Sequence, residues 1–200
     1  YKNGIFPWYE KGQPILWWSP DPRLVLLPEN LKVSRSLGKV LKRKYFEIRF
    51  DTAFQQVIKD CADVRIEQGR STWIIPEIQE AYLELYNEGF AHSIESWVDD
   101  KLVGGLYGVS LGQCFFGESM FSKINNSSKV ALVALVEFAL KYEIKLIDCQ
   151  MTTKHLLSLG AQEMKRKVFL ENLKKLLKKP TLIGNWNCDS LSIKSNYLQN

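Results

Sequence analysis

The sequence predicts an α+β fold, with a small β-rich domain over residues 1–50, a mixed domain over 51–179 and a polar C-terminal tail over 180–200. Prolines at positions 7, 14, 20, 22 and 28 exclude a long helix from the first segment, because proline lacks the amide hydrogen that a helix interior needs. From Asp51 the apolar residues recur at helical spacing, and from Ala91 the pattern is typical of strands.

The larger domain is predicted to begin with two helices, and Gly89 ends the second. Strands are expected over 91–98, 102–110 and 113–121, as an antiparallel meander with a turn at 99–101. There follow an apolar helix over 130–142, with Ser127 or Ser128 as N-cap, a strand over 145–150, a short helix over 156–161 and an amphipathic helix over 169–177. This is the element order of an acetyltransferase-like (GNAT-like) domain, but such folds host several chemistries.

The basic residues are concentrated in two segments. Lys32–Tyr45 holds six basic residues and no acidic one, and Met164–Lys179 holds seven basic residues and one acidic residue. The net charge of +5 therefore hides an acidic remainder. Two basic stretches on an acidic body suit a phosphate-bearing partner, although two solvated helix faces would give the same pattern. The first stretch is expected to form a short helix, followed by a short strand that ends at Phe50.

Several classes of protein do not fit the sequence. No apolar run approaches the roughly 18 residues of a membrane-spanning helix, and there is no leader pattern, so a soluble protein is expected. The four cysteines are widely separated and form no C-x-x-C pair, which favours reduced thiols over a zinc site or a disulfide framework. Because no glycine-rich nucleotide motif is present, we expect no ATP or dinucleotide cofactor. We expect no metal either, because the cysteines and histidines lack metal-ligand spacing.

Two polar residues stand at the end of the predicted strand 145–150. Alternation makes Asp148 and Gln150 project together while Cys149 points away. An aspartate that accepts a hydrogen bond from the glutamine NH₂ would orient the amide oxygen towards an incoming amine. The alternative is a strand-end pair that caps a neighbouring helix.

Glu118 is a carboxylate within the apolar strand 113–121. A buried, unpaired carboxylate is costly, so Glu118 should lie near the surface, be protonated or face a cation. That cation would be either a ligand or a lysine of the protein. Alternation places Phe115 and Glu118 on opposite faces of the strand, so both can line one site only if the strand bulges, as at Gly117.

Trp8 and Trp73 lie outside the regular apolar patterns, and their rings could stack on a nucleobase. Most of the six tryptophans are expected to be structural. His92 and His155 have no neighbouring nucleophile and no metal-ligand spacing, so both are expected to be structural or surface residues.

Read together, several segments resemble leucyl/phenylalanyl-tRNA–protein transferases, and the similarity runs from residue 4 to about 176. The segments are Gly4–Trp8, Leu16–Arg23, Gly69–Trp73, Ala91–Trp97, Val103–Val109, Phe116–Ser122 and Leu146–Gln150. The resemblance implies a cytoplasmic, monomeric enzyme without a cofactor or a membrane partner. Such an enzyme moves Leu, Phe or, less readily, Met from aminoacyl-tRNA to the α-amino group of proteins that begin with Arg or Lys, and so marks them for N-degron proteolysis.

The resemblance also implies roles for individual residues. Asp148 and Gln150 match the proposed catalytic pair of the family, and Glu118 matches the carboxylate that holds the basic N-terminal residue. The residues implied for the terminal adenosine are Trp8 and Trp73, those for the transferred side chain are Leu106, Phe115 and Leu132, and those for the tRNA backbone are Arg35, Lys39, Lys42 and Arg43. Ala139 departs from the pattern, because a larger aromatic residue is expected there, and Phe138 stands beside it.

Two other functions are compatible with parts of the sequence. An acyl-CoA-dependent N-acetyltransferase would need a glycine-rich loop for pyrophosphate, and the segment Ile124–Lys129 that precedes the helix has no glycine. A non-catalytic RNA-binding module would use the same basic stretch and tryptophans. It predicts tRNA binding without any product.

Overall fold

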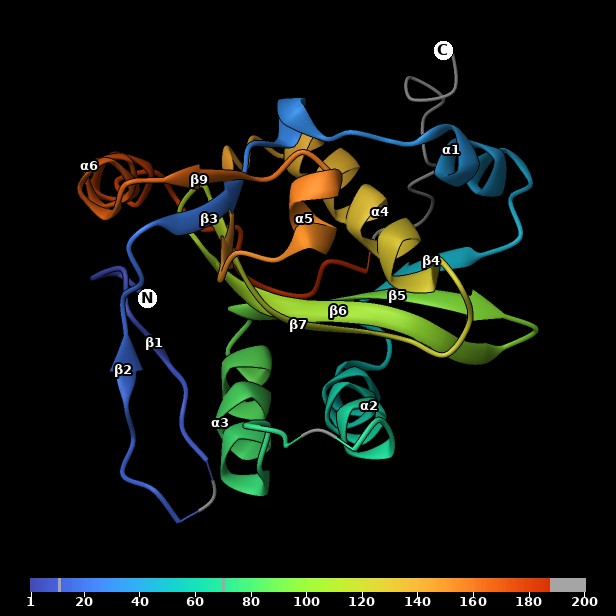
Figure 1. Cartoon of the computed structure of the whole chain (residues 1–200), viewed down its shortest axis with the longest axis horizontal. Helices are drawn as coiled ribbons and strands as arrows, with labels where there is room; N and C mark the ends of the chain where they lie inside the picture. Colours follow the sequence, from blue (N-terminus) through green and yellow to red (C-terminus); the bar gives the residue numbers. More distant parts are fainter. Residues whose placement is uncertain (11, 70, 188–200) are drawn as a thin grey trace.

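The computed structural model describes residues 1–10, 12–69 and 71–187, and it shows a mixed α/β fold around one large sheet (Figure 1). The sheet has seven strands in the order β4-β5-β6-β7-β8-β3-β9. Their bounds are β3 (Arg23–Leu26), β4 (Glu47–Phe50), β5 (Ala91–Val98), β6 (Lys101–Leu111), β7 (Cys114–Ser122), β8 (Leu146–Gln150) and β9 (Gln162–Met164). A separate hairpin consists of β1 (Phe6–Pro7) and β2 (Trp17–Trp18).

Helices cover both faces of the sheet, with α2 and α3 on one face and α4 and α5 on the other (Figure 1). The helices are α1 (Arg35–Lys42), α2 (Phe54–Glu67), α3 (Pro76–Asn87), α4 (Ser127–Lys141), α5 (Lys154–Ser158) and α6 (Arg166–Leu176), with a 3₁₀ turn, η1, at Pro28–Asn30. α1 and α6 lie at opposite ends of the long axis (Figure 1). Each face of the sheet carries its own cluster of buried apolar residues.

The predicted helices and the antiparallel meander are confirmed, with differences at the ends of elements. The predicted N-cap of α4 is wrong: Asn126 occupies the N-cap position, at a left-handed φ of +70° and without a side-chain capping hydrogen bond, and both serines lie inside the helix. Ser127 instead donates a side-chain hydrogen bond to the carbonyl oxygen of Val103. The short helix α5 begins earlier than predicted, because the side chain of Thr153 accepts a hydrogen bond from the backbone N–H of Leu156.

Two strands from the first 50 residues belong to the main sheet. β3 lies between β8 and β9, and β4 pairs with β5. Only the hairpin β1–β2 lies outside the main sheet among the described strands. The domain boundary at residue 50 stays a prediction. Within the predicted tail, Trp186 is only 3% exposed, whereas residues 188–200 lie outside the described residues.

The main sheet has an opening between β7 and β8. They are parallel, and they pair only over Cys114–Phe116 and Leu146–Asp148. Both strands continue past this ladder, to Ser122 and Gln150. The strands therefore diverge, and the backbone between them is left free to line a cavity.

Candidate active site

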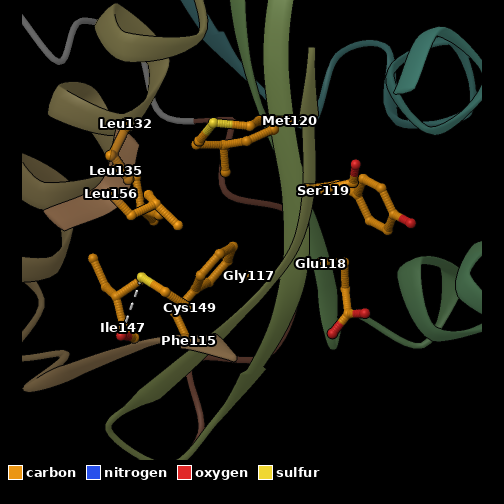
Figure 2. Close-up of a pocket in the computed structure, with 12 residues that line it drawn as sticks. Phe115, Gly117, Glu118, Ser119, Met120, Leu132, Leu135, Ile147, Cys149 and Leu156 are labelled. Carbon is orange, nitrogen blue, oxygen red and sulfur yellow. Dashed lines mark hydrogen bonds between the residues drawn. The ribbon is translucent and has the colours of Figure 1, made fainter. Parts of the chain in front are cut away.

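A bulge in β7 presents Glu118 at this opening. In the ladder with β6, Gly117 pairs with Gly108 and Ser119 pairs with Tyr107, so Glu118 is the extra residue. The strand thus bulges next to Gly117, the condition under which Phe115 and Glu118 were expected to line one site. The bulge does not bring Glu118 to the side of Phe115, however, because Figure 2 shows the two side chains on opposite sides of the strand. They flank the opening from its two faces.

Three polar groups surround the Glu118 carboxylate. The hydroxyl of Tyr1 donates to Oε1 at 2.7 Å, the hydroxyl of Tyr82 donates to Oε2 at 2.7 Å, and Nε2 of Gln150 donates to Oε1 at 2.9 Å. Burial raises the pKa of Glu118 to about 7, even though these hydrogen bonds favour the charged form, and the charge of Asp148 acts in the same direction as burial. Glu118 therefore changes its charge near neutral pH.

Gln150 ends β8 in an uncommon backbone conformation, with φ at +61°. A left-handed conformation is uncommon for residues other than glycine, and such residues gather at functional sites. The ladder of β8 with β3 pairs Asp148 with Val25 and Gln150 with Leu24, so Cys149 is passed over. This irregularity turns the last residue of the strand towards Glu118.

Asp148 is fully buried and pairs with a cation that the sequence reading did not identify. Arg23, on β3, donates from Nε to Oδ1 at 2.8 Å and from Nη2 to Oδ2 at 2.6 Å. The guanidinium also lies over the rings of Phe6 and Phe169, at 4.7 and 4.8 Å from their centroids. A two-point arginine–carboxylate pair fixes the orientation of the carboxylate as well as its position.

The expected hydrogen bond between the Asp148 carboxylate and the Gln150 side chain is wrong. Asp148 Oδ1 instead accepts from the backbone N–H of Gln150 at 2.9 Å, and the Gln150 NH₂ donates to Glu118. The two side chains do not meet because Arg23 occupies both carboxylate oxygens from the side of β3. Asp148 thus holds the backbone of Gln150, and Glu118 orients its amide.

An apolar cavity of about 110 Å³ lies on the α4 side of the opening (Figure 2). Leu106, Phe115 and Leu132, the three residues implied for a side-chain pocket, all line it. Its lining also includes Met120, Leu135, Ile147, Cys149 and Leu156. Ala139 is buried and is not among the lining residues, so the departure at this position lies outside the cavity wall.

A larger cavity of about 260 Å³ adjoins the apolar one, and the two share residues of β7 and β8 that include Gly117, Glu118 and Cys149. Trp8, Trp73 and Gln150 line the larger cavity, as does Arg65 of α2. Trp8 is 36% exposed, and its backbone carbonyl accepts a hydrogen bond from the indole N–H of Trp18 at 2.7 Å. Seven of the eight residues proposed for catalysis and for substrate binding therefore line these two cavities. The eighth, Asp148, lines neither cavity and lies buried behind Gln150.

The four basic residues proposed for tRNA lie away from these cavities. Arg35, Lys39 and Lys42 are on α1, Arg43 is its C-cap, and all four are exposed. None of the ion pairs found within the described residues involves them. Their charge is therefore available to a partner.

The described residues contain neither a candidate metal site nor a candidate membrane-spanning helix. Across residues 1–10, 12–69 and 71–187, no group of three or more histidine, cysteine or acidic side chains is placed to hold a metal ion. In the same residues no helix is both long enough and apolar enough to cross a membrane.

Comparisons with known proteins identify the family of the chain. Residues 25–174 match the family model for leucyl/phenylalanyl-tRNA protein transferase, and residues 1–21 match the model for the N-terminal domain of the same family. A leucyl/phenylalanyl-tRNA–protein transferase from Desulfatibacillum aliphaticivorans is 55% identical over 190 residues, which cover 95% of this chain and 82% of that protein. The same enzyme from Aromatoleum aromaticum is 57% identical over 189 residues, which cover 94% of this chain and 79% of that protein.

Among solved structures, an aminoglycoside acetyltransferase from an uncultured soil sample is similar with a TM-score of 0.44 and 15% identity, over 74% of this chain and 99% of that one. A likeness of this size carries no argument about function. The sequence matches, by contrast, include the residues that line both cavities and the opening between β7 and β8. The chain belongs to the leucyl/phenylalanyl-tRNA protein transferase family, a family of aminoacyltransferases.

Proposed function

We propose that this chain transfers Leu, Phe and, less readily, Met from aminoacyl-tRNA to the α-amino group of proteins that begin with Arg or Lys. The observation that carries the proposal is the opening between β7 and β8, where an apolar cavity adjoins a polar one beside Gln150 and Glu118. The product would enter N-degron proteolysis. Cytoplasmic location and a monomeric state are part of the same proposal.

The donor occupies both cavities in this proposal. The side chain of the transferred amino acid fills the apolar cavity, between Leu106, Phe115 and Leu132. The terminal adenosine lies in the larger cavity against the rings of Trp8 and Trp73, where stacking is worth about 1–3 kcal/mol per base. The ester that joins the two parts then lies at the shared opening, next to Gln150.

The N-terminal side chain of the acceptor protein binds next to the Glu118 carboxylate. A cationic Arg or Lys side chain at this position stabilises the ionised carboxylate and lowers its pKa from about 7, so binding of the acceptor charges the site. Tyr1 and Tyr82 hold the two carboxylate oxygens in place. Selection of a basic N-terminal residue then follows from charge and from the limited room beside two tyrosine rings.

The chemistry needs little beyond positioning, because an aminoacyl ester is already activated. A free α-amino group has a pKa of about 7.7–8.0 and is partly neutral at cellular pH. Its nitrogen attacks the ester carbonyl carbon, a C–N bond forms, the bond to the ribose oxygen breaks, and the proton released by the amine ends on that oxygen. Gln150, whose NH₂ is fixed on Glu118, presents its carbonyl oxygen to the amine, and well-oriented reactants gain about 7–11 kcal/mol.

The proposal also covers the arrangement of the catalytic part and the contacts of α1 with tRNA. The antiparallel meander β5–β6–β7, followed by α4 and the diverging parallel strand β8, supports an acetyltransferase-like arrangement of the catalytic part. Arg35, Lys39, Lys42 and Arg43 would contact phosphates of the tRNA body. Such contacts make affinity dependent on salt but carry no sequence information.

A transfer assay tests the proposal. Labelled leucine on tRNA is offered, with this chain, to two peptides that differ only in an N-terminal Arg or Ala. The proposal predicts labelled Arg peptide, little labelled Ala peptide, and a loss of product of about 100-fold or more in the Gln150→Ala variant. Binding of tRNA without product from any variant would instead support the RNA-binding module.

A further inference from the structure

Residues 181–186, here called the C-terminal strap, are tied to the body of the protein at three points. The backbone N–H of Gly112 donates to Thr181 Oγ1 at 2.8 Å, and the backbone N–H of Gly184 donates to the carbonyl oxygen of Gly89 at 3.1 Å. The backbone N–H of Trp186 donates to Asp51 Oδ2 at 2.8 Å. The strap therefore reaches Trp186 with a fixed path.

Gly89 makes this path possible. A Cβ atom at Gly89 would lie 2.5 Å from the backbone nitrogen of Gly184, a distance that real Cβ atoms do not adopt. The residue also has a φ of +79°, which favours glycine. The close approach shows that the strap packs directly on the backbone at Gly89, and the positive φ is a second reason for glycine at this position.

The indole of Trp186 is buried in an aromatic stack at the end of the strap. Its ring lies 3.6 Å from His92 with an interplanar angle of 7°, and 4.3 Å from Phe138 with an angle of 23°. His92 is held in turn, because its Nδ1 lies 2.8 Å from Asp51 Oδ2. The position of the indole is thus fixed by two rings and by its own backbone.

Phe115, which forms a wall of the apolar cavity, lies beside this stack with its ring tilted by 40° to the indole. The ring centroids of Trp186 and Phe115 are 6.0 Å apart. On β6, Gly108 leaves room for the same ring, since a Cβ atom there would lie 2.7 Å from two Phe115 ring atoms. Neither Trp186 nor Gly108 lines the cavity, yet both bound the space that the Phe115 ring can occupy.

We propose that Trp186 is a specificity-determining residue, because it holds Phe115 in place and so sets how large a donor side chain the apolar cavity accepts. This inference rests on the proposed function. Loss of the indole opens space behind Phe115, into which the phenyl ring can withdraw. The apolar cavity then becomes larger, and binding of a bulky donor side chain improves more than binding of a small one.

The experiment compares the parent chain with Trp186→Ala and with the matched control Trp186→Phe, which keeps an aromatic ring. Dissociation constants are measured by calorimetry for 3′-amide-linked leucyl-adenosine and phenylalanyl-adenosine, which cannot react. A pocket distinguishes side chains that differ by one methylene by about 10–200-fold, so a partial enlargement should raise the preference for phenylalanine about fivefold in Trp186→Ala. Trp186→Phe should change the ratio less than about twofold.

The ratio of two constants is insensitive to the fraction of a variant that is folded, so a purely structural Trp186 would leave it unchanged. An unchanged ratio, or a shift towards leucine, overturns the inference alone. If the parent binds neither analogue, the proposed function fails and the inference fails with it.

Discussion

The Glu118→Gln variant removes a negative charge that destabilises the folded protein. Glu118 has a pKa of about 7 in the folded protein, compared with the ordinary value of 4.5. At about 1.36 kcal/mol per pH unit this difference corresponds to roughly 3 kcal/mol. We discount it to about 2 kcal/mol because Glu118 is only half-buried and lines a cavity, where solvent screens its charge. The ionised carboxylate therefore destabilises the folded state by about this amount.

The sign of the pH dependence follows from proton uptake. Below pH 4.5, Glu118 is protonated in both the folded and the unfolded chain. Between pH 4.5 and about 7 the unfolded chain loses this proton first, so the contribution of Glu118 to stability falls as pH rises, and above pH 7 it is constant. Glutamine cannot ionise, and it keeps an oxygen for the Gln150 amide.

The assay is thermal unfolding of parent and variant at pH 4.5 and at pH 8. Glu118→Gln should unfold about 4–8 °C higher than the parent at pH 8 and at about the same temperature at pH 4.5, while transfer to an Arg peptide is lost. Glu84→Gln, a change at an exposed glutamate of α3, is the matched control and should show no such difference. A variant that is less stable than the parent at pH 8 would refute the reasoning.

Three further predictions concern other residues. Asp148→Asn leaves the buried guanidinium of Arg23 without its charged partner and should lower the free energy of unfolding by about 3–5 kcal/mol, measured by urea titration; a loss below 1 kcal/mol would contradict the pairing. Gln150→Ala should lower transfer about 100-fold or more but weaken binding of the donor analogue, measured by calorimetry, by less than about tenfold, because the lost amide mainly orients the amine; an equal loss in both would contradict this role. Lys39→Ala with Lys42→Ala should reduce the slope of log K for tRNA against log salt by about 1–2, and an unchanged slope would show that α1 does not contact phosphate.

The regular elements could be predicted because their signals are local. Apolar spacing placed α2 and α3, and alternation with the Asp99–Asp100 turn placed β5 and β6. The apolar cavity follows from these elements together with the resemblance, since Leu106, Phe115 and Leu132 come from strands and a helix that were correctly located.

The polar contacts of the site depend on pairings across long stretches of sequence, and they could not be predicted. Arg23 meets Asp148 only because β3 inserts next to β8, more than 100 residues away in the chain. The same insertion takes both Asp148 oxygens, so the Gln150 amide turns to Glu118 instead. The buried guanidinium had one available signal: an arginine that opens an apolar strand, Arg23–Leu26, needs a carboxylate partner.

Trp186 and the other residues of the strap gave no periodic signal. Their seat depends on a close approach to Gly89 and on an aromatic stack with His92, both of which are properties of the folded chain. The roles of the site residues stay predictions.

The most direct test of the account is a crystal structure of this chain with 3′-amide-linked leucyl-adenosine bound. The account predicts the leucine side chain in the cavity lined by Leu106 and Phe115, the adenine ring against Trp8 and Trp73, and the amide that replaces the ester beside Gln150. An analogue bound elsewhere, or with its leucine outside the apolar cavity, would contradict the claim that transfer takes place in the opening between β7 and β8.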